Sequence, residues 1–276
     1  MRSILEDDAI NTVVITTRHN LHASMVVDAL AAGKHVFVEK PLAMNDQELQ
    51  QVQDAYQATS GQQLMVGFNR RFSPHAERMK QLLQGRTGPL CMNMMVNAGS
   101  IPSDHWVHDP ESGGGRMIGE GCHWIDLMMF LAGAPITKCQ AATIGDVPGV
   151  TTRNDHAAAV FTFADGSLGT LHYFANGNRA YPKEKLTVFA DGKVLELDNF
   201  RLLQGFGWSN FKKFKTMRQD KGHQAECLQF VQRIADGGEP LIPFDSLWNV
   251  THFSFQADPI AWKRVAADEP TTTLVC

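Results

Sequence analysis

The sequence contains no apolar run that approaches the roughly 20 residues a membrane-spanning helix needs. Its first ten residues, MRSILEDDAI, carry acidic side chains where a secretory signal has an apolar segment. Lysine and arginine form no basic block and the net charge is −4, which argues against a nucleic-acid-binding surface. The five cysteines are scattered and form no C-x-x-C pair. These absences predict a reduced, cytoplasmic protein that binds neither membranes nor nucleic acid.

Strands and helices alternate through the first 70 residues. The short apolar runs at 12–16, 35–39 and 64–68 predict strands buried on both faces. Between them, residues 22–32 have apolar side chains at helical spacing, and Gly33 stands where a left-handed glycine would end that helix. Asn45 is a good N-cap for the next helix, and Glu48 completes a capping-box pattern. This order predicts parallel strands with right-handed crossovers.

The pattern changes after a further helix predicted over residues 73–85. Asp165-Gly166 and Asp191-Gly192 each stand between two apolar runs, which is a strong signal for a tight hairpin. A mostly antiparallel sheet and its helices follow, and residues 200–220 are interpreted as a mobile loop over that sheet. The predicted strands are 90–98, 137–144, 156–163, 168–175, 185–190 and 193–198, and the predicted helices are 117–132, 221–236 and 245–267.

We therefore expect an α/β plus α+β protein. Residues 1–86 would form an incomplete dinucleotide-binding (Rossmann) domain with a parallel sheet. Residues 87–276 would form a domain with an open, mostly antiparallel sheet and flanking helices, which binds substrate and oligomerises.

The first domain is expected to be incomplete because the sequence has no G-x-G-x-x-G motif. Those glycines let the backbone approach the cofactor pyrophosphate at a helix N-terminus. Gly119-x-Gly121 has Trp124 at the third position, and Gly205-x-Gly207 has Asn210. We expect the chain to begin about 60 residues into such a domain. The cofactor-binding half would then be truncated, or supplied by a fused or separate chain.

The sequence Val36–Pro41 places a lysine at the end of a predicted buried strand. Val36-Phe37-Val38 leads into Glu39-Lys40, and Pro41 stops an ordinary strand from continuing. The carboxyl ends of the strands are where open α/β sheets bind ligands. A lysine at this position is either a surface residue or a ligand-binding cation, and the strand alone does not decide between them.

Three motifs together resemble one enzyme family. They are residues 31–41 (AAGKHVFVEKP) preceded by His22, residues 66–72 (VGFNRRF), and Gly113-Gly114-Gly115 followed by residues 121–126 (GCHWID). In order and spacing they resemble the glucose-fructose oxidoreductase, inositol dehydrogenase and rhizopine-catabolism (Gfo/Idh/MocA) family. The resemblance implies a Rossmann domain followed by an open-sheet domain whose exposed face makes a homo-oligomer interface.

The resemblance also implies the parts of a dehydrogenase site. Lys40 would lie beside the nicotinamide and the substrate hydroxyl and stabilise a developing alkoxide, and His123 would help relay the substrate proton. Both are the expected catalytic residues, and NAD or NADP is the expected cofactor. The expected cofactor contacts are Thr16, Thr17, His22, Glu39, Lys40, Pro41 and Arg70, and the expected substrate contacts are Lys40, Asn69, Arg71, Trp106, Glu120, His123 and Asp126.

The sequence departs from the family pattern one turn before His123. The family often has aspartate four residues before this histidine, where this chain has Gly119 and then Glu120. Glu120, His123 and Asp126 have helical neighbour spacing, so a carboxylate is expected to orient the His123 ring. Whether Glu120 replaces the aspartate stays open, because one residue turns a helix position by about 100°.

The histidines and aspartates at 104–109 raise the possibility of a metal site. Their spacing matches no common zinc pattern, so no metal is expected. Trp106, in the same stretch, is expected to pack on a sugar ring.

These features favour an oxidoreductase that transfers a hydride between NAD(P) and a hydroxyl of a sugar, polyol or nucleotide sugar. The alternative is a non-catalytic substrate-binding or assembly domain that needs the missing cofactor-binding half. A lyase of the same fold, with hydride transfer as an internal step, is a third reading.

Overall fold

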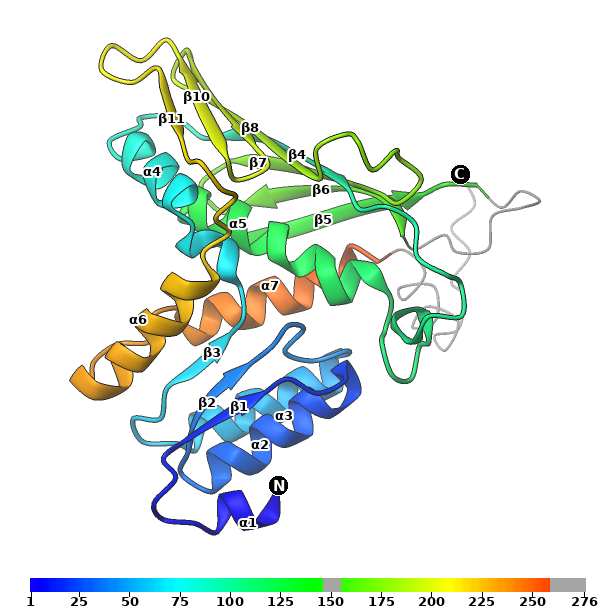
Figure 1. The fold of residues 1–276 in the computed structure, drawn as a ribbon, viewed down its shortest axis with the longest axis vertical. Helices are drawn as coiled ribbons and strands as arrows, with labels where there is room; N and C mark the ends of the chain where they lie inside the picture. The colour runs from blue at the N-terminus through cyan, green and yellow to red at the C-terminus, as the bar shows by residue number, and fades with distance from the viewer. Residues whose placement is uncertain (146–154, 259–276) are drawn as a thin grey trace, which may run out of the picture.

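The computed structural model of the protein describes residues 1–145 and 155–258. A small parallel sheet contains β1 (Thr12–Ile15), β2 (His35–Val38) and β3 (Leu64–Val66) in that order. Helices α2 (His22–Ala31) and α3 (Asp46–Gln57) cover one face of this sheet, and α1 (Arg2–Leu5) lies near its end (Figure 1). Among the described residues β1 pairs with β2 alone, so its outer edge is unpaired.

The ends of these helices follow from local sequence. The Asn45 side chain accepts a hydrogen bond from the Glu48 N–H at 2.9 Å and caps α3. Ser73 caps α4 (Pro74–Leu83) in the same way, through the Ala76 N–H at 3.1 Å. Gly33 has a φ of +72°, the left-handed conformation expected after α2. The predicted helix boundaries of this half are therefore confirmed to within a few residues.

The second sheet has eight strands in the order β11-β10-β9-β8-β4-β7-β6-β5. All neighbouring pairs are antiparallel except β4 and β7, which run parallel. Six strands lie where they were predicted: β4 (Cys91–Asn97), β5 (Ile136–Thr143), β6 (His156–Phe163), β7 (Leu168–Phe174), β8 (Glu184–Ala190) and β9 (Lys193–Asp198).

Residues 200–220 are not a loop, so that prediction is wrong. They contain β10 (Leu202–Phe206) and β11 (Lys213–Lys215), which extend the sheet beyond β9. Leu203 is buried, and Phe214 packs against the core from the edge strand. Alternating apolar and polar side chains are the signal for a strand, and the glycines and lysines in this stretch interrupt that pattern.

Both Asp-Gly pairs form hairpin turns. Gly166 has a φ of +83° between β6 and β7. Asp191 and Gly192 have φ values of +48° and +73° between β8 and β9, the two left-handed residues that the tightest hairpins require.

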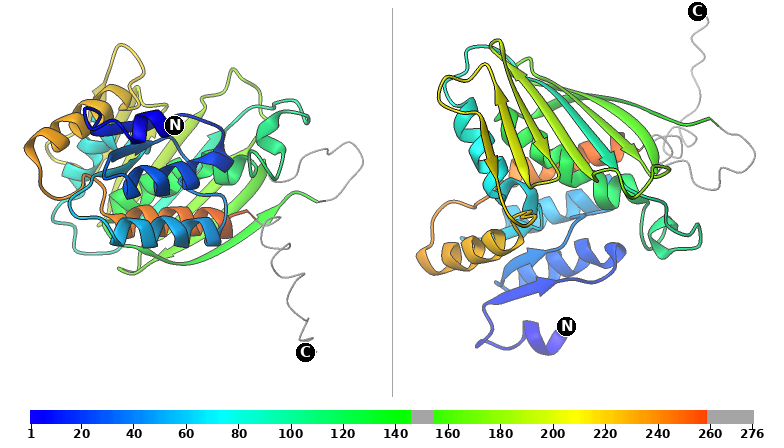
Figure 2. Two further views of the ribbon diagram at one scale, coloured as in Figure 1. Left: turned by 90° about the horizontal axis from the view of Figure 1, so that it is seen from below. Right: turned by 45° about the horizontal axis from the view of Figure 1, so that its top comes forward.

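Helices α5 (Cys122–Ala132) and α7 (Phe244–Gln256) lie between the two sheets, and together with α4 they cover one face of the large one (Figure 1). The opposite face of the large sheet has no described helix over it (Figure 2). Helix α6 (His223–Asp236) reaches the small sheet, where the Phe230 ring lies 5.7 Å from that of Phe37. The predicted fold class is confirmed. Predicted helix residues 259–267 lie outside the described part of the chain.

Apolar side chains form a row across the uncovered face of the large sheet. Strand pairing aligns Leu168 with Cys91, Cys91 with Phe189, Phe189 with Val194, and Val194 with Phe206. Phe189 and Phe206 are about half exposed, at 50% and 53%.

No helix in residues 1–145 or 155–258 has the length and apolar character to cross a bilayer.

Candidate active site

Three loops meet where the strands of the small sheet end. β1 is followed by residues 16–17, β2 by residues 39–41, and β3 by Gly67. Parallel strands end at the same edge, which is where such sheets bind ligands. A Cβ atom on Gly67 would come within 3.1 Å of a Glu39 carboxylate oxygen, so glycine at this position leaves room for Glu39.

His22 joins the loops that follow β1 and β2. Its Nδ1 lies 2.7 Å from the Pro41 carbonyl oxygen, and its Nε2 lies 3.1 Å from the Thr17 carbonyl oxygen. The ring is fully buried. The Lys40–Pro41 peptide bond is cis. In this structure His22 positions the loop that carries Lys40, and its expected cofactor contact stays a prediction.

The Lys40 ammonium group is half-buried and has no hydrogen bond or ion pair with the described residues. Its charge lowers the pKa values of His19, Glu120 and His123, so all three lie within its electrostatic reach. A half-buried cation without an anion attracts a ligand atom that carries, or develops, negative charge.

His123 lies in the first turn of α5 and is 8% exposed. Burial holds its pKa well below the ordinary value, and the positive charges of Arg70 and Lys40 act in the same direction. The ring is therefore neutral at pH 7. Its Nδ1 is sealed from solvent without a hydrogen-bond partner. The prediction that a neighbouring carboxylate orients this ring is therefore wrong.

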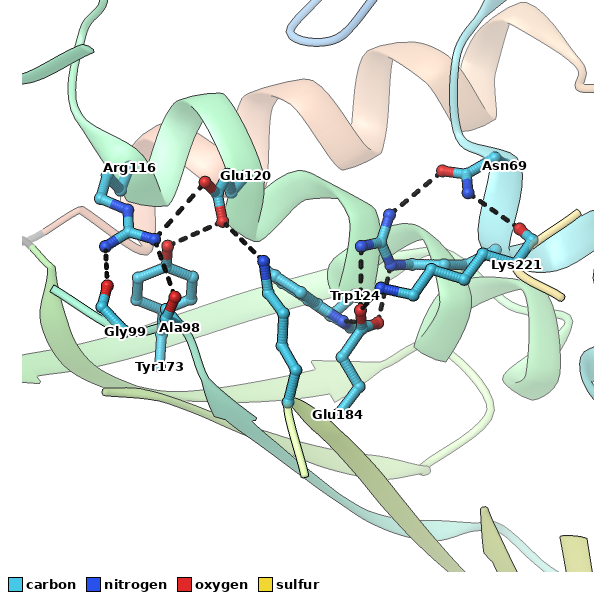
Figure 3. Close-up of polar contacts among 11 residues, drawn as sticks. Asn69, Ala98, Gly99, Arg116, Glu120, Trp124, Tyr173, Glu184 and Lys221 are labelled. Carbon is cyan, nitrogen blue, oxygen red and sulfur yellow. Dashed lines mark hydrogen bonds and ion pairs between the residues drawn. The ribbon is translucent and has the colours of Figure 1, made fainter. Parts of the chain in front are cut away.

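Glu120 turns away from His123 because it lies in a π-helix, η4 (Met117–Gly121). A π-helix has more residues per turn, which rotates the following side chains relative to an α-helix. The Tyr173 hydroxyl donates to Glu120 at 2.9 Å, Arg116 donates at 3.5 Å, and the Lys183 ammonium lies 3.8 Å away. Figure 3 shows Arg116 and Tyr173 converging on the Glu120 carboxylate.

Glu120 is anionic in this setting. Burial raises its pKa, but the positive charges of Lys183, Arg116 and Lys40 lower it by more. Its side chain is 28% exposed, so solvent or a ligand can reach it.

Asn69 and Arg70 belong to a second polar network, around Glu184 on β8. Arg70 donates to Glu184 at 2.9 and 3.2 Å, and the Trp124 indole N–H donates at 2.8 Å. Lys221 completes the set with an ion pair at 2.5 Å (Figure 3). Asn69 accepts from Arg70 and donates to the Lys221 carbonyl oxygen. These contacts join the end of β3 to the large sheet.

Arg71 and Asp126 form a buried ion pair with each other. Two guanidinium nitrogens donate to the two carboxylate oxygens, at 2.9 and 2.5 Å, and Asp126 is fully buried. Both Asp126 oxygens are used in this pair. The Arg71 guanidinium also lies 5.2 Å from the centroid of the Phe130 ring. The expected substrate contacts of both residues stay predictions.

Trp106 begins the short helix η3 (Trp106–His108). Its ring meets the edge of the His19 ring with 4.8 Å between centroids, and Arg18 lies 5.6 Å from it. Its expected contact with a sugar stays a prediction. No group of three or more metal-ligating side chains occurs in the described part of the chain.

Several polar residues of this region had no signal in the sequence. They come from elements whose neighbours are set by sheet order and register: His19, Tyr173, Lys183, Glu184, Lys221 and His223. His19 alone had a local hint, because it lies three residues before His22 after a strand.

Two family matches cover most of the chain. Residues 1–68 match a family described as "Oxidoreductase family, NAD-binding Rossmann fold", and residues 76–196 match "GFO/IDH/MocA C-terminal domain".

Curated proteins and solved structures are similar over most of this chain. It is 26% identical over 212 residues to "Uncharacterized oxidoreductase YrbE" of Bacillus subtilis, covering 72% of this chain and 59% of that protein. It is 26% identical over 259 residues to scyllo-inositol 2-dehydrogenase (NAD(+)) of the same organism, covering 87% and 72%. A levoglucosan dehydrogenase in complex with NADH has a TM-score of 0.77 at 22% identity, covering 95% of this chain and 80% of the other, which shows a shared fold.

Proposed function

The chain belongs to the Gfo/Idh/MocA family of oxidoreductases, and from this premise we propose that it transfers a hydride between NAD(P) and a hydroxyl group of a sugar or polyol. The observation that carries the proposal is the Lys40 ammonium, half-buried at the carboxyl edge of the parallel sheet without a described anionic partner. The inositol and levoglucosan dehydrogenases among its relatives favour a polyhydroxylated ring as the substrate.

The described residues fit the nicotinamide end of the cofactor. Thr16 and Thr17 are exposed after β1, and Lys40 is a cation with room for a ligand oxygen. Residues 1–145 and 155–258 contain no glycine-rich turn of the kind that holds a pyrophosphate, so we assign no residue to that group. NAD(P)+, when bound, supplies the hydride acceptor.

Lys40 is proposed to bind the reacting hydroxyl oxygen. Its ammonium donates a hydrogen bond to that oxygen and stabilises the alkoxide that develops as the O–H proton leaves. His22 holds the Lys40 loop through the Pro41 carbonyl oxygen, so the ammonium is positioned before substrate arrives.

His123 is proposed to contact the substrate through Nε2. No described group is hydrogen-bonded to its Nδ1, and the nearby positive charges disfavour a charged ring. A neutral ring with its proton on Nε2 avoids burying an unpaired N–H and donates to a substrate oxygen. Glu120, anionic and partly exposed, is proposed to accept from a second hydroxyl of the same ring.

The alternative is a chain that binds substrate without turning it over. The absent glycine-rich turn favours this reading, because the pyrophosphate anchor would have to come from other residues. Calorimetric titration with NADH and NADPH separates the two. Binding in the micromolar range supports the oxidoreductase, and no binding of either cofactor supports the substrate-binding module.

The decisive experiment is a Lys40→Met substitution in the full-length protein. We expect kcat/KM for polyol oxidation to fall at least about 100-fold, because the alkoxide loses its cation. Lys138→Met is the control, since Lys138 is exposed on β5 and has no hydrogen bond or ion pair with the described residues. Turnover by Lys40→Met within twofold of the wild type would contradict the proposal.

A further inference from the structure

The His19 ring occupies the space beside Gly119, one helical turn before His123. His19 starts the short helix η1 (His19–Leu21) after β1 and is 6% exposed. A Cβ atom built on Gly119 would come within 2.7 Å of His19 Cε1, closer than packed atoms allow. The two residues are therefore complementary: glycine at 119 is what admits the ring at 19.

One ring nitrogen of His19 has a hydrogen-bond partner, and the other has none among the described residues. His19 Nδ1 lies 2.7 Å from the Gly113 carbonyl oxygen. A carbonyl only accepts, so Nδ1 carries the proton and donates it. In the neutral ring the lone pair is then on Nε2, which has no hydrogen-bond partner among the described residues. Unlike Nδ1 of His123, this nitrogen is not among the buried atoms sealed from solvent.

The His19 ring lies among residues of the proposed site. Burial lowers the pKa of His19 to about 4, and the positive charge of Lys40 acts in the same direction, while the hydrogen bond to Gly113 and the negative charge of Glu120 raise it. Trp106 packs against the ring from the side of η3. The His19 and His22 ring centroids are 5.8 Å apart, and His22 binds the Pro41 carbonyl oxygen next to Lys40. His19 therefore lies beside the loop that carries Lys40, and both His19 and Glu120 are within electrostatic reach of Lys40.

His19 is a better proton acceptor than His123. An imidazolium at 19 would keep its hydrogen bond to Gly113 and would lie near the Glu120 carboxylate. An imidazolium at 123 would leave Nδ1–H buried without an acceptor, among the charges of Arg70, Lys40 and Lys221. Desolvation and the Lys40 charge oppose both, but only His19 has a hydrogen bond and a carboxylate that favour the charged ring.

We propose that His19 is a catalytic residue of this site, whose Nε2 accepts the hydrogen bond and then the proton of the reacting substrate hydroxyl. This inference rests on the proposed dehydrogenase function. In the oxidation direction the substrate O–H bond breaks and its proton moves to Nε2. The hydride lost from the carbinol carbon is the one that NAD(P)+ accepts, so the carbon is oxidised and the cofactor reduced. The proton then leaves to solvent.

Two substitutions test the roles of the two His19 ring nitrogens separately. The Asn side chain reaches as far as Nδ1, so His19→Asn can keep the donor to Gly113 while it loses Nε2. The Gln side chain reaches as far as Nε2, so His19→Gln can bind the hydroxyl but cannot take its proton. We expect kcat to fall about 100-fold or more in both, as for loss of a general base. We expect KM to rise in His19→Asn and to stay near the wild-type value in His19→Gln.

The control is His252→Asn, which changes a histidine on α7 that pairs with Asp46. Its kinetics should equal those of the wild type. If the wild type oxidises a polyol such as inositol and His19→Asn matches it within twofold, His19 is not the acceptor, and the proposed function stands. If the wild type oxidises no polyol with NAD+ or NADP+, the proposed function fails and the role of His19 fails with it.

A second readout does not depend on turnover. In protein labelled with ¹⁵N-histidine, we expect the Nε2 resonance of His19 to shift on addition of inositol, while that of His252 does not. An unchanged Nε2 resonance at saturating inositol would overturn the inference.

The close packing of the His19 ring against Gly119 gives a further test. Gly119→Ala should displace the His19 ring and lower kcat at least about 10-fold, while Gly145→Ala, with no atom of the described residues within 4 Å of its Cβ, should not. In a His19→Asn background, which lacks Cε1, Gly119→Ala should change kcat less than twofold further. Additive effects of the two substitutions would contradict the proposed fit.

Discussion

Two carboxyl groups near the site, those of Glu184 and Glu226, are similarly buried, but the first is ionised and the second is protonated at neutral pH. Glu184 is 1% exposed and Glu226, in the first turn of α6, is 3% exposed. Burial raises the pKa of Glu184, but Arg70 and Lys221 lower it to about 2. Burial, together with the nearby carboxylates of Glu39 and Asp126, raises the pKa of Glu226 to about 9. Neighbouring charges, and not depth, decide which carboxyl keeps its proton.

Glu226 should make the protein less stable as the pH rises. The folded state keeps its proton between pH 4.5 and about 9, whereas the unfolded chain releases it above its ordinary pKa of 4.5. Folding therefore takes up a proton in this range, and the free energy of unfolding falls as pH rises through it. We expect Glu226→Gln to be more stable than the wild type at pH 8 by on the order of 4–5 kcal/mol and equal to it near pH 4.

Urea unfolding at a series of pH values measures this effect. Glu77→Gln, on the exposed face of α4, is the control and should leave the pH dependence unchanged. A Glu226→Gln protein with the same pH dependence as the wild type would show that Glu226 is ionised in the folded state.

Lys40 and His123 could be proposed from the sequence because each lies in a contiguous motif, and their catalytic roles stay predictions. The His19 role could not, because it depends on a contact across 100 positions, with Gly119. The sequence shows that residue 119 is a glycine, but not which side chain fills the space beside it. The sequence also could not show that His123 Nδ1 lacks a carboxylate partner among the described residues.

At the scale of elements, the Glu184 carboxylate joins four parts of the chain. It lies on β8 and binds Arg70 from η2 (Asn69–Phe72), Trp124 from α5, and Lys221 just before α6. These contacts hold the end of the small sheet against the large one, next to the candidate site. A buried ion network of this kind adds little as a whole but is costly to break from one side.

We expect Glu184→Gln to lower the free energy of unfolding by about 3–5 kcal/mol at pH 7, because two buried cations lose their anion. Its folded-state pKa of about 2 means that the stabilisation is present above pH 4.5 and is lost as pH falls from 4.5 towards 2. Chemical denaturation followed by tryptophan fluorescence measures the loss. Glu196→Gln on the neighbouring β9 is the control, and an equal effect of both would contradict a special role for Glu184.

Elements with strong local signals were predictable, and those set by distant contacts were not. Asn45, Ser73, Gly33 and the two Asp-Gly turns each determine their own backbone, so these ends and hairpins were foreseen. The π-helix η4 was not, because a continuous apolar pattern gives the same helix prediction with or without an added residue in one turn. Glu120 lies in this turn and accepts a hydrogen bond from Tyr173.

At the scale of the molecule, the uncovered face of the large sheet favours self-association. The row Leu168–Cys91–Phe189–Val194–Phe206 crosses five strands with no described helix over it. A sheet with one uncovered, partly apolar face is commonly buried in a symmetric dimer. We propose that this face joins two copies of the chain.

We expect the wild type to sediment as a dimer or larger oligomer and Phe189→Glu to sediment as a monomer, because a charge would be buried in the interface. Val231→Glu is the matched control, since Val231 is 64% exposed on α6, away from the sheet. Sedimentation velocity at several concentrations distinguishes the species. A Phe189→Glu protein that keeps the wild-type oligomeric state would exclude this face.

The last described helices of the chain return to its first sheet. Phe230 of α6 packs against Phe37 of β2, and Phe244 of α7 stacks on Tyr56 of α3 with 4.5 Å between ring centroids. A single apolar core runs from β1 through these helices to the large sheet. We therefore expect the boundary that the sequence suggests near residue 86 not to separate two unfolding units. The strand ends that present Lys40 and the helix η4 that presents Glu120 should unfold together, so that neither half of the site is lost while the other survives.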